Sequence, residues 1–312
     1  MSSGVRSHTV PQADRVAMTL PRLQEMKENG EPIVMVTAYD FPSATVAEAA
    51  GVDLVLVGDS AANVVLGYDR TDLVSMEEMI VLGRAVRRGL KTALMIGDMP
   101  MGSYEASDEL AITNAQRLIK ETGCQAVKLE AGGVSVQRAK AIVAAGIPVM
   151  GHLGLTPQTA TALGGYKAQG KSAKAAIQMS EDARALQDAG CFAVVFEAVP
   201  AEIAATIAAR LDIITIGIGA GAATSGQVLV FHDLLGITTG HMAKFVKRYA
   251  DVHEEMVAAV GRYAAEVRGG SFPGPEHAYA IDEEELAEFR SHVEVEEDAF
   301  ASAKSWEWEP LA

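Results

Sequence analysis

The stretch LVLVGDS (residues 54–60) places four apolar residues directly before a glycine, a carboxylate and a hydroxyl. An uninterrupted apolar run is typical of a strand covered on both faces, as in a parallel sheet packed against helices. Asp59 or Ser60 taken alone could be a turn residue or a helix cap. The same order of apolar run and polar ending recurs along the chain, which favours a common role for the polar groups.

Seven further segments repeat this apolar character, so eight strands are expected in all. They read IVMVTAYD (33–40), ALMIGDMP (93–100), AVKLEA (126–131), IPVMGHL (147–153), FAVVFEAV (192–199), IITIGIGAG (213–221) and QVLVFHDLLG (227–236). The runs are nearly continuous in Val, Ile and Leu and do not alternate strictly, which indicates strands covered by helices.

Most of the segments between these runs have helical periodicity. Their apolar residues recur at i, i+3 and i+4, and several end in glycine, the usual C-cap. Helices are expected at 19–29, 76–89, 107–123, 134–146, 180–190 and 201–211. This alternation predicts an α/β fold, a (β/α)8 TIM barrel with a short N-terminal helix; an open, doubly wound sheet is the alternative.

No Pro- or Gly-rich linker divides the 312 residues. We therefore expect one barrel domain over residues 19–277, an N-terminal arm over 1–18 and an acidic C-terminal tail over 278–312. Residues 282–312 carry eleven acidic side chains against Arg290 and Lys304, within a net charge of −15 for the chain. This tail is either a solvated segment or an interaction segment. Without a basic stripe, nucleic acid is not an expected partner.

Cysteine content and hydropathy point to a soluble protein of the cytoplasm. Cys124 and Cys191 are the two cysteines of the chain, too few for a disulfide framework and suited to a reducing compartment. No run reaches the ~18 apolar residues of a membrane span. The first residues, MSSGVRSHTV, lack the apolar core of a signal peptide.

Polar residues stand at the carboxyl end of nearly every predicted strand. In a barrel these ends meet at one mouth, where barrel enzymes carry their active sites. The residues are Tyr39, Asp40, Asp59, Ser60, Asp98, Lys128, Glu130, His152, Glu197, His232 and Asp233. Polar residues placed at random would not recur at the same end, so the pattern predicts a shared site.

The stretch AVKLEAG (126–132) places two opposite charges inside the predicted barrel. Lys128 and Glu130 are two residues apart and point to one face of the strand, while Val127 and Leu129 point to the other. The apolar pair must face the helices, so the ammonium and the carboxylate face inward. Buried charges persist when they are paired or bound to a metal ion. An internal ion pair with no further role is the alternative to a functional site.

The neighbouring strands favour a metal site. Asp59 and Asp98 would add two carboxylates to Glu130 in one partly desolvated mouth, and a single lysine cannot neutralise three. Oxygen ligands suit Mg2+ or Mn2+ better than zinc.

His152 and Glu197 are further candidates. His152, in VMGHLGL, is either a hydrogen-bonded barrel histidine or a site residue. Glu197 follows the apolar segment VVF, and an apolar wall should raise its pKa. A carboxylate with a pKa near neutral pH is suited to act as a general base.

Short segments spread over about residues 19–277 match a known family in their order. They read VTAYD, LVGDS, LGYDRT, GDMP, VKLEAG, GHLGLTPQ, GGYKAQG, FEAVP, GIGAG and GQVLVFHDLLG. GHLGLTPQ and GGYKAQG together are highly specific. On these segments the chain resembles the ketopantoate hydroxymethyltransferase family.

The resemblance implies a Mg2+-dependent barrel enzyme of pantothenate biosynthesis, found in the cytoplasm as a homo-oligomer that can be as large as a decamer. It implies transfer of a hydroxymethyl unit from 5,10-methylenetetrahydrofolate to 3-methyl-2-oxobutanoate, which gives 2-dehydropantoate and tetrahydrofolate. The partners would be these small molecules, with no membrane and no nucleic acid.

The resemblance also assigns roles to residues of this chain. Asp59, Asp98 and Glu130 match the metal-associated carboxylates. The matched contacts to the 2-oxo acid are Asp59, Ser60, Asp98 and Lys128, with His152 in support. Glu197 matches the proton acceptor.

Three other interpretations of the same residues are open. Lys128 could form a Schiff base, as in metal-free aldolases, although nearby carboxylates would keep it protonated. A related Mg2+ barrel that cleaves or rearranges 2-oxo acids would share the carboxylates but not the specific segments. A barrel used as a scaffold, with the acidic tail as its contact, would show no metal-dependent turnover.

Overall fold

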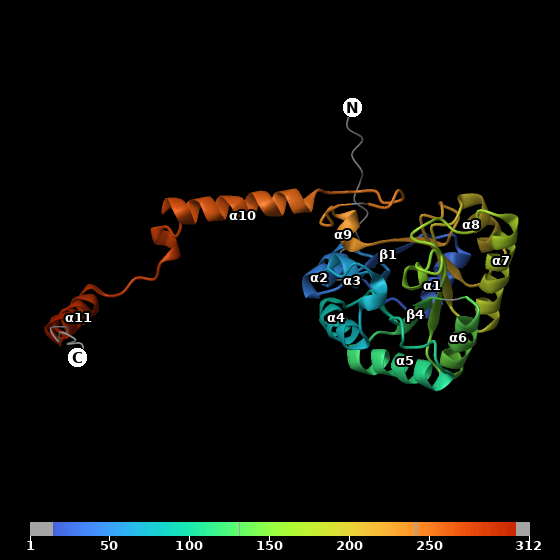
Figure 1. Cartoon of the computed structure of the whole chain (residues 1–312), viewed down its shortest axis with the longest axis horizontal. Coiled ribbons are helices and arrows are strands. Elements are labelled where there is room, and N and C mark those ends of the chain that lie inside the picture. The colour runs from blue at the N-terminus through green and yellow to red at the C-terminus, as the bar shows by residue number, and fades with distance from the viewer. Residues whose placement is uncertain (1–14, 131, 241, 304–312) are drawn as a thin grey trace, which may run out of the picture. The chain divides into compact units, whose positions relative to one another are not determined.

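The computed structural model describes residues 15–130, 132–240 and 242–303. Most of the predicted N-terminal arm and the last nine residues of the tail lie outside these ranges. The described part contains eight parallel strands closed into a barrel in chain order (Figure 1). They are β1 (Ile33–Thr37), β2 (Leu54–Val57), β3 (Leu94–Asp98), β4 (Ala126–Glu130), β5 (Val149–Gly154), β6 (Ala193–Glu197), β7 (Ile214–Ile218) and β8 (Gly226–Leu229).

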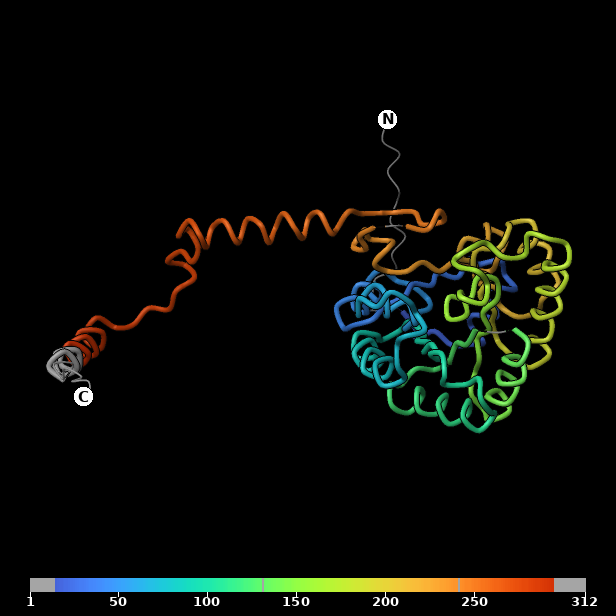
Figure 2. Tube along the Cα trace, in the orientation of Figure 1, coloured from blue at the N-terminus to red at the C-terminus, as the bar shows by residue number. Residues whose placement is uncertain are grey.

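Helices surround the barrel, and Figure 2 follows the chain around this ring from blue to yellow. The longer ones are α1 (Leu20–Glu28), α2 (Phe41–Ala50), α4 (Met76–Gly89), α5 (Asp108–Thr122), α6 (Val134–Ala144), α7 (Ala173–Asp188) and α8 (Ala201–Ala208). The short ones are α3 (Ala61–Val64), η2 (Thr71–Leu73), η3 (Pro157–Thr159) and α9 (Phe231–Leu234). The predicted (β/α)8 barrel is confirmed.

The pairing of β1 with β8 closes the barrel and rules out the open sheet. The register runs from Ile33 opposite Gly226 to Val36 opposite Leu229. A Cβ atom at position 226 would lie 2.3 Å from the carbonyl oxygen of Ile33, so the close approach of the two strands requires glycine.

The end of the eighth apolar run differs from the prediction. A strand was expected over 227–236, but β8 ends at Leu229 and the one-turn helix α9 follows. The amide of Phe231 leaves the strand ladder and donates to Oγ1 of Thr37 at 2.9 Å. His232 and Asp233 therefore lie on a helix and not on a strand end.

Two helices near the C-terminus were not expected from the sequence. They are α10 (Val252–Gly269) and α11 (Glu283–Ala303), with the short η4 (Pro275–His277) between them. The chain divides into two compact units at His253–Glu254. The predicted domain limits at 19 and 277 stay a prediction. Within the described ranges, no helix has both the length and the apolar character that crossing a membrane requires.

The barrel interior is apolar at one end and polar at the other. On β3 the inward side chains are Leu94, Ile96 and then Asp98, which is fully buried. The same order occurs on β4, where Ala126 precedes Lys128 and Glu130. Because side chains on one face recur every second residue, β3 and β4 each carry an apolar start and a polar carboxyl end on the inner face.

A buried carboxylate on α2 fixes the chain where it enters β3. Glu48, 2% exposed, accepts the backbone N–H groups of Lys91 (3.0 Å), Thr92 (2.9 Å) and Ala93 (3.2 Å). Burial alone would raise the pKa of Glu48. The hydrogen bonds from the Thr92 hydroxyl and the three amides favour the charged form, and the net effect lowers that pKa.

We expect Glu48→Gln to lower the free energy of unfolding by about 2 kcal/mol at pH 7, because the new NH2 group faces hydrogen-bond donors. A lowered folded pKa means that the charged form stabilises the fold fully above its ordinary value of 4.5, and that this stabilisation is lost as pH falls through the folded pKa. Urea unfolding of the wild type and of Glu48→Gln between pH 7 and pH 3.5 should show the difference in their free energies of unfolding shrinking below pH 4.5.

The control is Glu181→Gln, at an exposed position on α7, which should leave the urea midpoint of the wild type unchanged. A difference that is constant with pH would contradict this role for the carboxylate.

Candidate active site

The carboxyl ends of β2 to β6 bring the predicted site residues to one mouth of the barrel. In the strand register, Asp98 lies opposite Lys128 and Glu130 lies opposite His152. Glu197 lies opposite Gly154 on β5. Asp59 follows β2 and donates its backbone N–H to Oδ2 of Asp98 at 3.1 Å. The parallel strands thus gather groups that lie up to 138 positions apart in the chain (Asp59 to Glu197).

Lys128 and Asp98 form an ion pair inside the barrel. Nζ of Lys128 lies 2.8 Å from Oδ1 of Asp98, and their side chains are 5% and 0% exposed. Burial would lower the pKa of Lys128, but the charges of Asp98, Asp59 and Glu130 raise it above its ordinary value. The ammonium therefore stays charged, which weighs against a Schiff-base role for this lysine.

The carboxylates outnumber the cation. Burial raises the pKa of Asp98 to about 7, with the charge of Lys128 acting in the opposite direction. Burial, followed by the charge of Asp59, raises the pKa of Glu130 to about 9. The charge of Asp59 thus disfavours the ionised forms of Asp98 and Glu130, beside a single ammonium.

The donor set fits a hard divalent cation in its chemistry. Asp59, Asp98 and Glu130 offer carboxyl oxygens, and a bound cation would favour the ionised forms that burial disfavours at Asp98 and Glu130. As the side chains stand, no three His, Cys, Asp or Glu groups among the described residues converge closely enough to hold a metal ion. Asp98 faces Lys128, and Gln158 binds both Asp59 and Glu130.

Gln158 was not singled out from the sequence. It lies on η3 and is 4% exposed. Its Nε2 donates to Oδ2 of Asp59 at 3.0 Å, and its backbone N–H donates to Oε2 of Glu130 at 3.1 Å. A neutral amide in a loop carries no charge that would mark it, and membership of the GHLGLTPQ segment was its one signal.

His152 lies between two carboxylates and is neutral. Nε2 lies 3.3 Å from Oε2 of Glu197 and Nδ1 lies 3.8 Å from Oε1 of Glu130. Burial and the charge of Lys128 lower the pKa of His152 well below its ordinary value. Within the described part of the chain, both ring nitrogens are buried without a hydrogen-bond partner. Such nitrogens are suited to receive a polar ligand.

Glu197 is the more accessible carboxylate of the mouth, with a side chain 16% exposed. Burial raises its pKa to about 8, and the charge of Lys128 acts against this rise. Its backbone carbonyl accepts the N–H of Leu155 at 2.8 Å, which ties β6 to the loop after β5. The pKa of Glu197 is thus raised, as expected from the apolar segment that precedes it in the sequence.

Ser60 reaches the mouth from the loop after β2. Its Oγ lies 2.8 Å from the phenolic oxygen of the buried Tyr39. The Tyr39 ring lies 5.4 Å from that of His232. Asp40 and Asp233 have local roles instead: Asp40 accepts the N–H of Ser43 and caps α2, and Asp233 accepts the hydroxyl of Thr238.

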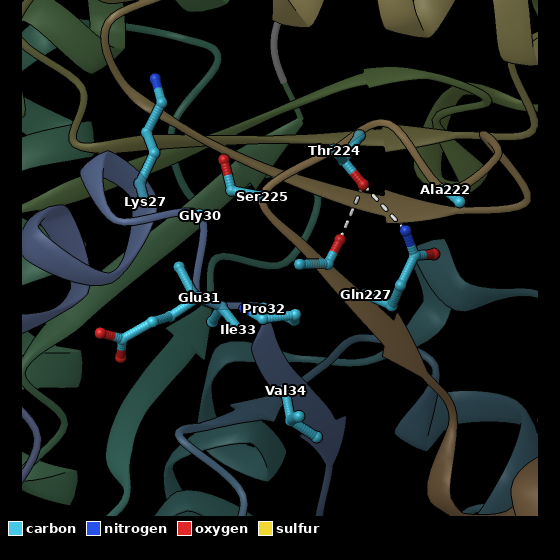
Figure 3. Close-up of a pocket in the computed structure, with 11 residues that line it drawn as sticks. Lys27, Gly30, Glu31, Pro32, Ile33, Val34, Ala222, Thr224, Ser225 and Gln227 are labelled. Atoms are coloured by element: carbon cyan, nitrogen blue, oxygen red, sulfur yellow. Dashed lines mark hydrogen bonds between the residues drawn. The ribbon is translucent and has the colours of Figure 1, made fainter.

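A cavity of about 390 Å³ lies away from these groups (Figure 3). It is bordered by Ile33 and Gly226, the first residues of β1 and β8, and so lies at the amino ends of the strands. Lys27, on its wall, donates to the carbonyls of Leu211 and Ile213. Because its polar groups are engaged in the fold, we assign the chemistry to the opposite mouth.

Solved structures of low sequence identity share the barrel. Phosphonopyruvate hydrolase is 12% identical, with a TM-score of 0.55, and the match covers 93% of this chain and 99% of that one. 2,3-Dimethylmalate lyase, described as a member of the PEP mutase/isocitrate lyase superfamily, is 15% identical with a TM-score of 0.52, covering 89% of this chain and 100% of that one. At this identity the likeness concerns the fold alone.

Relatives with much higher identity cover most of the chain. The 3-methyl-2-oxobutanoate hydroxymethyltransferase of Moorella thermoacetica is 54% identical over 86% of this chain and 99% of its own. The enzyme of Heliobacterium modesticaldum is 52% identical, and the match covers 86% of this chain and 97% of the relative. The enzyme of Oleidesulfovibrio alaskensis is 49% identical, and the match covers 92% of this chain and 99% of the relative.

The family match coincides with the barrel. Residues 17–275 match the family described as ketopantoate hydroxymethyltransferase. The predicted resemblance is confirmed, and the matched range includes every residue of the mouth described above. The chain belongs to the ketopantoate hydroxymethyltransferase family, a family of transferases.

Proposed function

We propose that this protein transfers a hydroxymethyl unit from 5,10-methylenetetrahydrofolate to 3-methyl-2-oxobutanoate and releases 2-dehydropantoate and tetrahydrofolate. The observation that carries the proposal is the placement of Glu197, a charged Lys128 and three further carboxylates at one barrel mouth. Relatives of about half identity that bear the name of this activity support it.

Glu197 would remove the proton from C3 of the 2-oxo acid. A pKa of about 8 makes Glu197 a stronger base than an ordinary carboxylate, and about a tenth of it is still ionised at pH 7. Its side chain is partly exposed, and the neutral His152 beside it adds no positive charge that would weaken the base. C3 would then form a bond to the one-carbon unit of the folate, so no side chain needs to become a nucleophile. Because that unit is a methylene bridge, one water molecule would supply the oxygen of the new hydroxyl group, and the bonds from the methylene carbon to the folate nitrogens would break as tetrahydrofolate leaves.

The substrate oxygens would bind to Lys128, Ser60 and His152. The buried ammonium of Lys128 offsets the negative charge that develops on the keto oxygen as the C3 proton leaves, and in a desolvated site this effect is large. The hydroxyl of Ser60, held by Tyr39, and the one N–H group of the neutral His152 ring would donate hydrogen bonds to the substrate oxygens.

We also propose Mg2+ as the cofactor, held by Asp59, Asp98 and Glu130, with Asp59 and Asp98 also contacting the substrate. When bound, the ion would polarise the 2-oxo acid and make its C3 proton more acidic. Three buried acidic side chains beside one ammonium support this assignment, because a bound cation would favour their ionised forms.

A homo-oligomer, up to a decamer, is part of the proposal. Met256, Val260, Tyr263 and Val267 of α10 follow a 4-3-4 spacing that places them on one helix face, and they are 46–66% exposed. The barrel unit has an apolar groove of about 300 Å³ lined by α2, β8 and α9, with Val46 and Tyr249 exposed at it. Exposed apolar surfaces of this kind are typical of protein–protein contacts.

We also propose a cytoplasmic location. Cys124 and Cys191 are buried and form no disulfide, which suits a reducing compartment.

Glu197→Gln should slow the exchange of the C3 proton of 3-methyl-2-oxobutanoate in D2O by at least about 100-fold, because the amide cannot accept the proton. Proton NMR with Mg2+ and without folate measures this rate directly. The matched control is Glu202→Gln, an exposed carboxylate on α8, which should exchange like the wild type. Exchange at the wild-type rate in Glu197→Gln would remove this residue from the role of base. No exchange by the wild type even with tetrahydrofolate added would contradict the proposed reaction.

A chelator distinguishes the metal-dependent mechanism from one that uses a Schiff base on Lys128. EDTA should abolish the exchange and added Mg2+ should restore it, if the carboxylates hold the cation. Exchange that continues in EDTA, together with substrate trapped on Lys128 by borohydride, would instead support Schiff-base chemistry.

Light scattering should give a mass several times the 32.8 kDa of one chain. Val260→Glu, in the apolar face of α10, should reduce this mass because a charge would have to be desolvated at the contact. Ala258→Glu, two residues away and pointing to the opposite side of the helix, is the matched control. A wild-type mass of one chain, or equal effects of the two variants, would contradict the assignment of this face.

A further inference from the structure

We propose that Gln158 and Tyr104 form a positioning pair that holds Asp59 and Glu130 in place for ligand binding. The inference rests on the proposed function in that these carboxylates serve the cation and the 2-oxo acid. Neither Gln158 nor Tyr104 needs to touch the substrate, because they act through the two carboxylates.

Gln158 uses every part of its amide and its backbone N–H. Nε2 donates to Oδ2 of Asp59 (3.0 Å) and to the carbonyl of Met99 (3.1 Å). Oε1 accepts the hydroxyl of Tyr104 at 3.0 Å. The backbone N–H donates to Glu130, 3.1 Å from Oε2 and 3.3 Å from Oε1. Gln158, a single residue in the loop after β5, therefore connects the carboxyl ends of β2, β3 and β4.

Tyr104 determines which way the amide of Gln158 points. A glutamine side chain can flip, and a flipped amide would set its oxygen against the carboxylate of Asp59. The phenolic hydroxyl donates to Oε1, and the carbonyl of Met99 can only accept, so both contacts hold Nε2 toward Asp59. Burial raises the pKa of Tyr104, which keeps the hydroxyl protonated as a donor.

The loop that carries Tyr104 is fixed by its own hydrogen bonds. The amide of Met99 donates to the carbonyl of Lys128 at 2.8 Å, at the carboxyl end of β4. Asn114 on α5 donates to the carbonyl of Ser103 at 2.8 Å. Glu105 accepts the N–H of Tyr104 at 3.2 Å. The hydroxyl is thus presented from a loop attached to both a strand and a helix.

The chemistry of glutamine suits this position better than that of its alternatives. The side chains of Asp59 and Glu130 are both buried, and each needs a hydrogen-bond donor to keep a fixed orientation; Gln158 supplies one to each. A lysine or arginine at 158 would supply donors but would also neutralise the charge that attracts a cation. A glutamate would repel Asp59. A neutral donor orients the carboxylates and leaves their charge available.

The test uses Mn2+ alone as a probe, titrated into the full-length metal-free protein and followed by electron paramagnetic resonance without substrate. We expect Tyr104→Phe and Gln158→Met to bind Mn2+ about tenfold more weakly than the wild type, as is common when the groups that orient ligands are removed. Excess Mg2+ should restore kcat in Tyr104→Phe, which a general loss of folding would not allow.

Gln187→Met on α7 is the matched control. Gln187 also bridges two segments, since Oε1 accepts the N–H of Asp212 at 2.7 Å and Nε2 donates to the Asp212 side chain at 3.3 Å. The variant Gln187→Met should lower the urea midpoint of unfolding without changing the affinity for Mn2+.

Wild-type affinity in both Tyr104→Phe and Gln158→Met would overturn the positioning role while leaving the proposed reaction intact. If Gln158→Met does not fold, Tyr104→Phe decides, because it removes a single hydroxyl. A wild-type protein that binds no Mn2+ would overturn the proposed cofactor, and the inference with it.

Discussion

The closure of β1 on β8 is the constraint on which the rest of the molecule depends. Hydrogen bonding between these strands turns eight parallel segments into a ring, so that their carboxyl ends face one another across a single mouth. An open sheet would have placed the ends of the first and last strands at opposite edges. Closure depends in turn on a backbone approach so tight that position 226 has no room for a side chain.

Closure also concentrates charge. Lys128 is buried next to Asp98, and three acidic side chains, Asp59, Asp98 and Glu130, lie around this one ammonium. Burial above all, and the neighbouring carboxylates in addition, raise the pKa values of Asp98 and Glu130. The fold tolerates this arrangement because backbone and amide donors, above all those of Gln158, take up part of the carboxylate charge. A site with unsatisfied electrostatics is one that gains by binding ligands, and such clusters are typical of functional sites.

The barrel fold and most residues of its mouth could be predicted from the sequence, for physical reasons. Continuous apolar runs mark buried parallel strands, and the two-residue spacing of Lys128 and Glu130 requires them to share the inner face. The early end of β8 was missed because the apolar residues after Leu229 suit a buried helix as well as a strand, and a hydrogen bond from Phe231 to Thr37 decides between them. Gln158 was missed because its importance arises from tertiary contacts to three other segments. The helix α10 lies after the last predicted strand, outside the strand–helix alternation from which the other helices were predicted, and it was missed although Met256, Val260, Tyr263 and Val267 have helical spacing.

The apolar filling at the amino ends of the strands has a consequence for the order of events. Leu54, Leu94, Ile214 and Ile216 pack inside the barrel below the charged residues and block passage along its axis. Under the proposed reaction, the small 2-oxo acid and the much larger folate would therefore share one entrance, with the acid bound deeper. The acid would then have to enter before the folate covers it, and tetrahydrofolate would have to leave before the new product could follow. If the proposed reaction is correct, the packing of the barrel floor would thus impose an ordered kinetic sequence in which the smaller ligand binds first and leaves last.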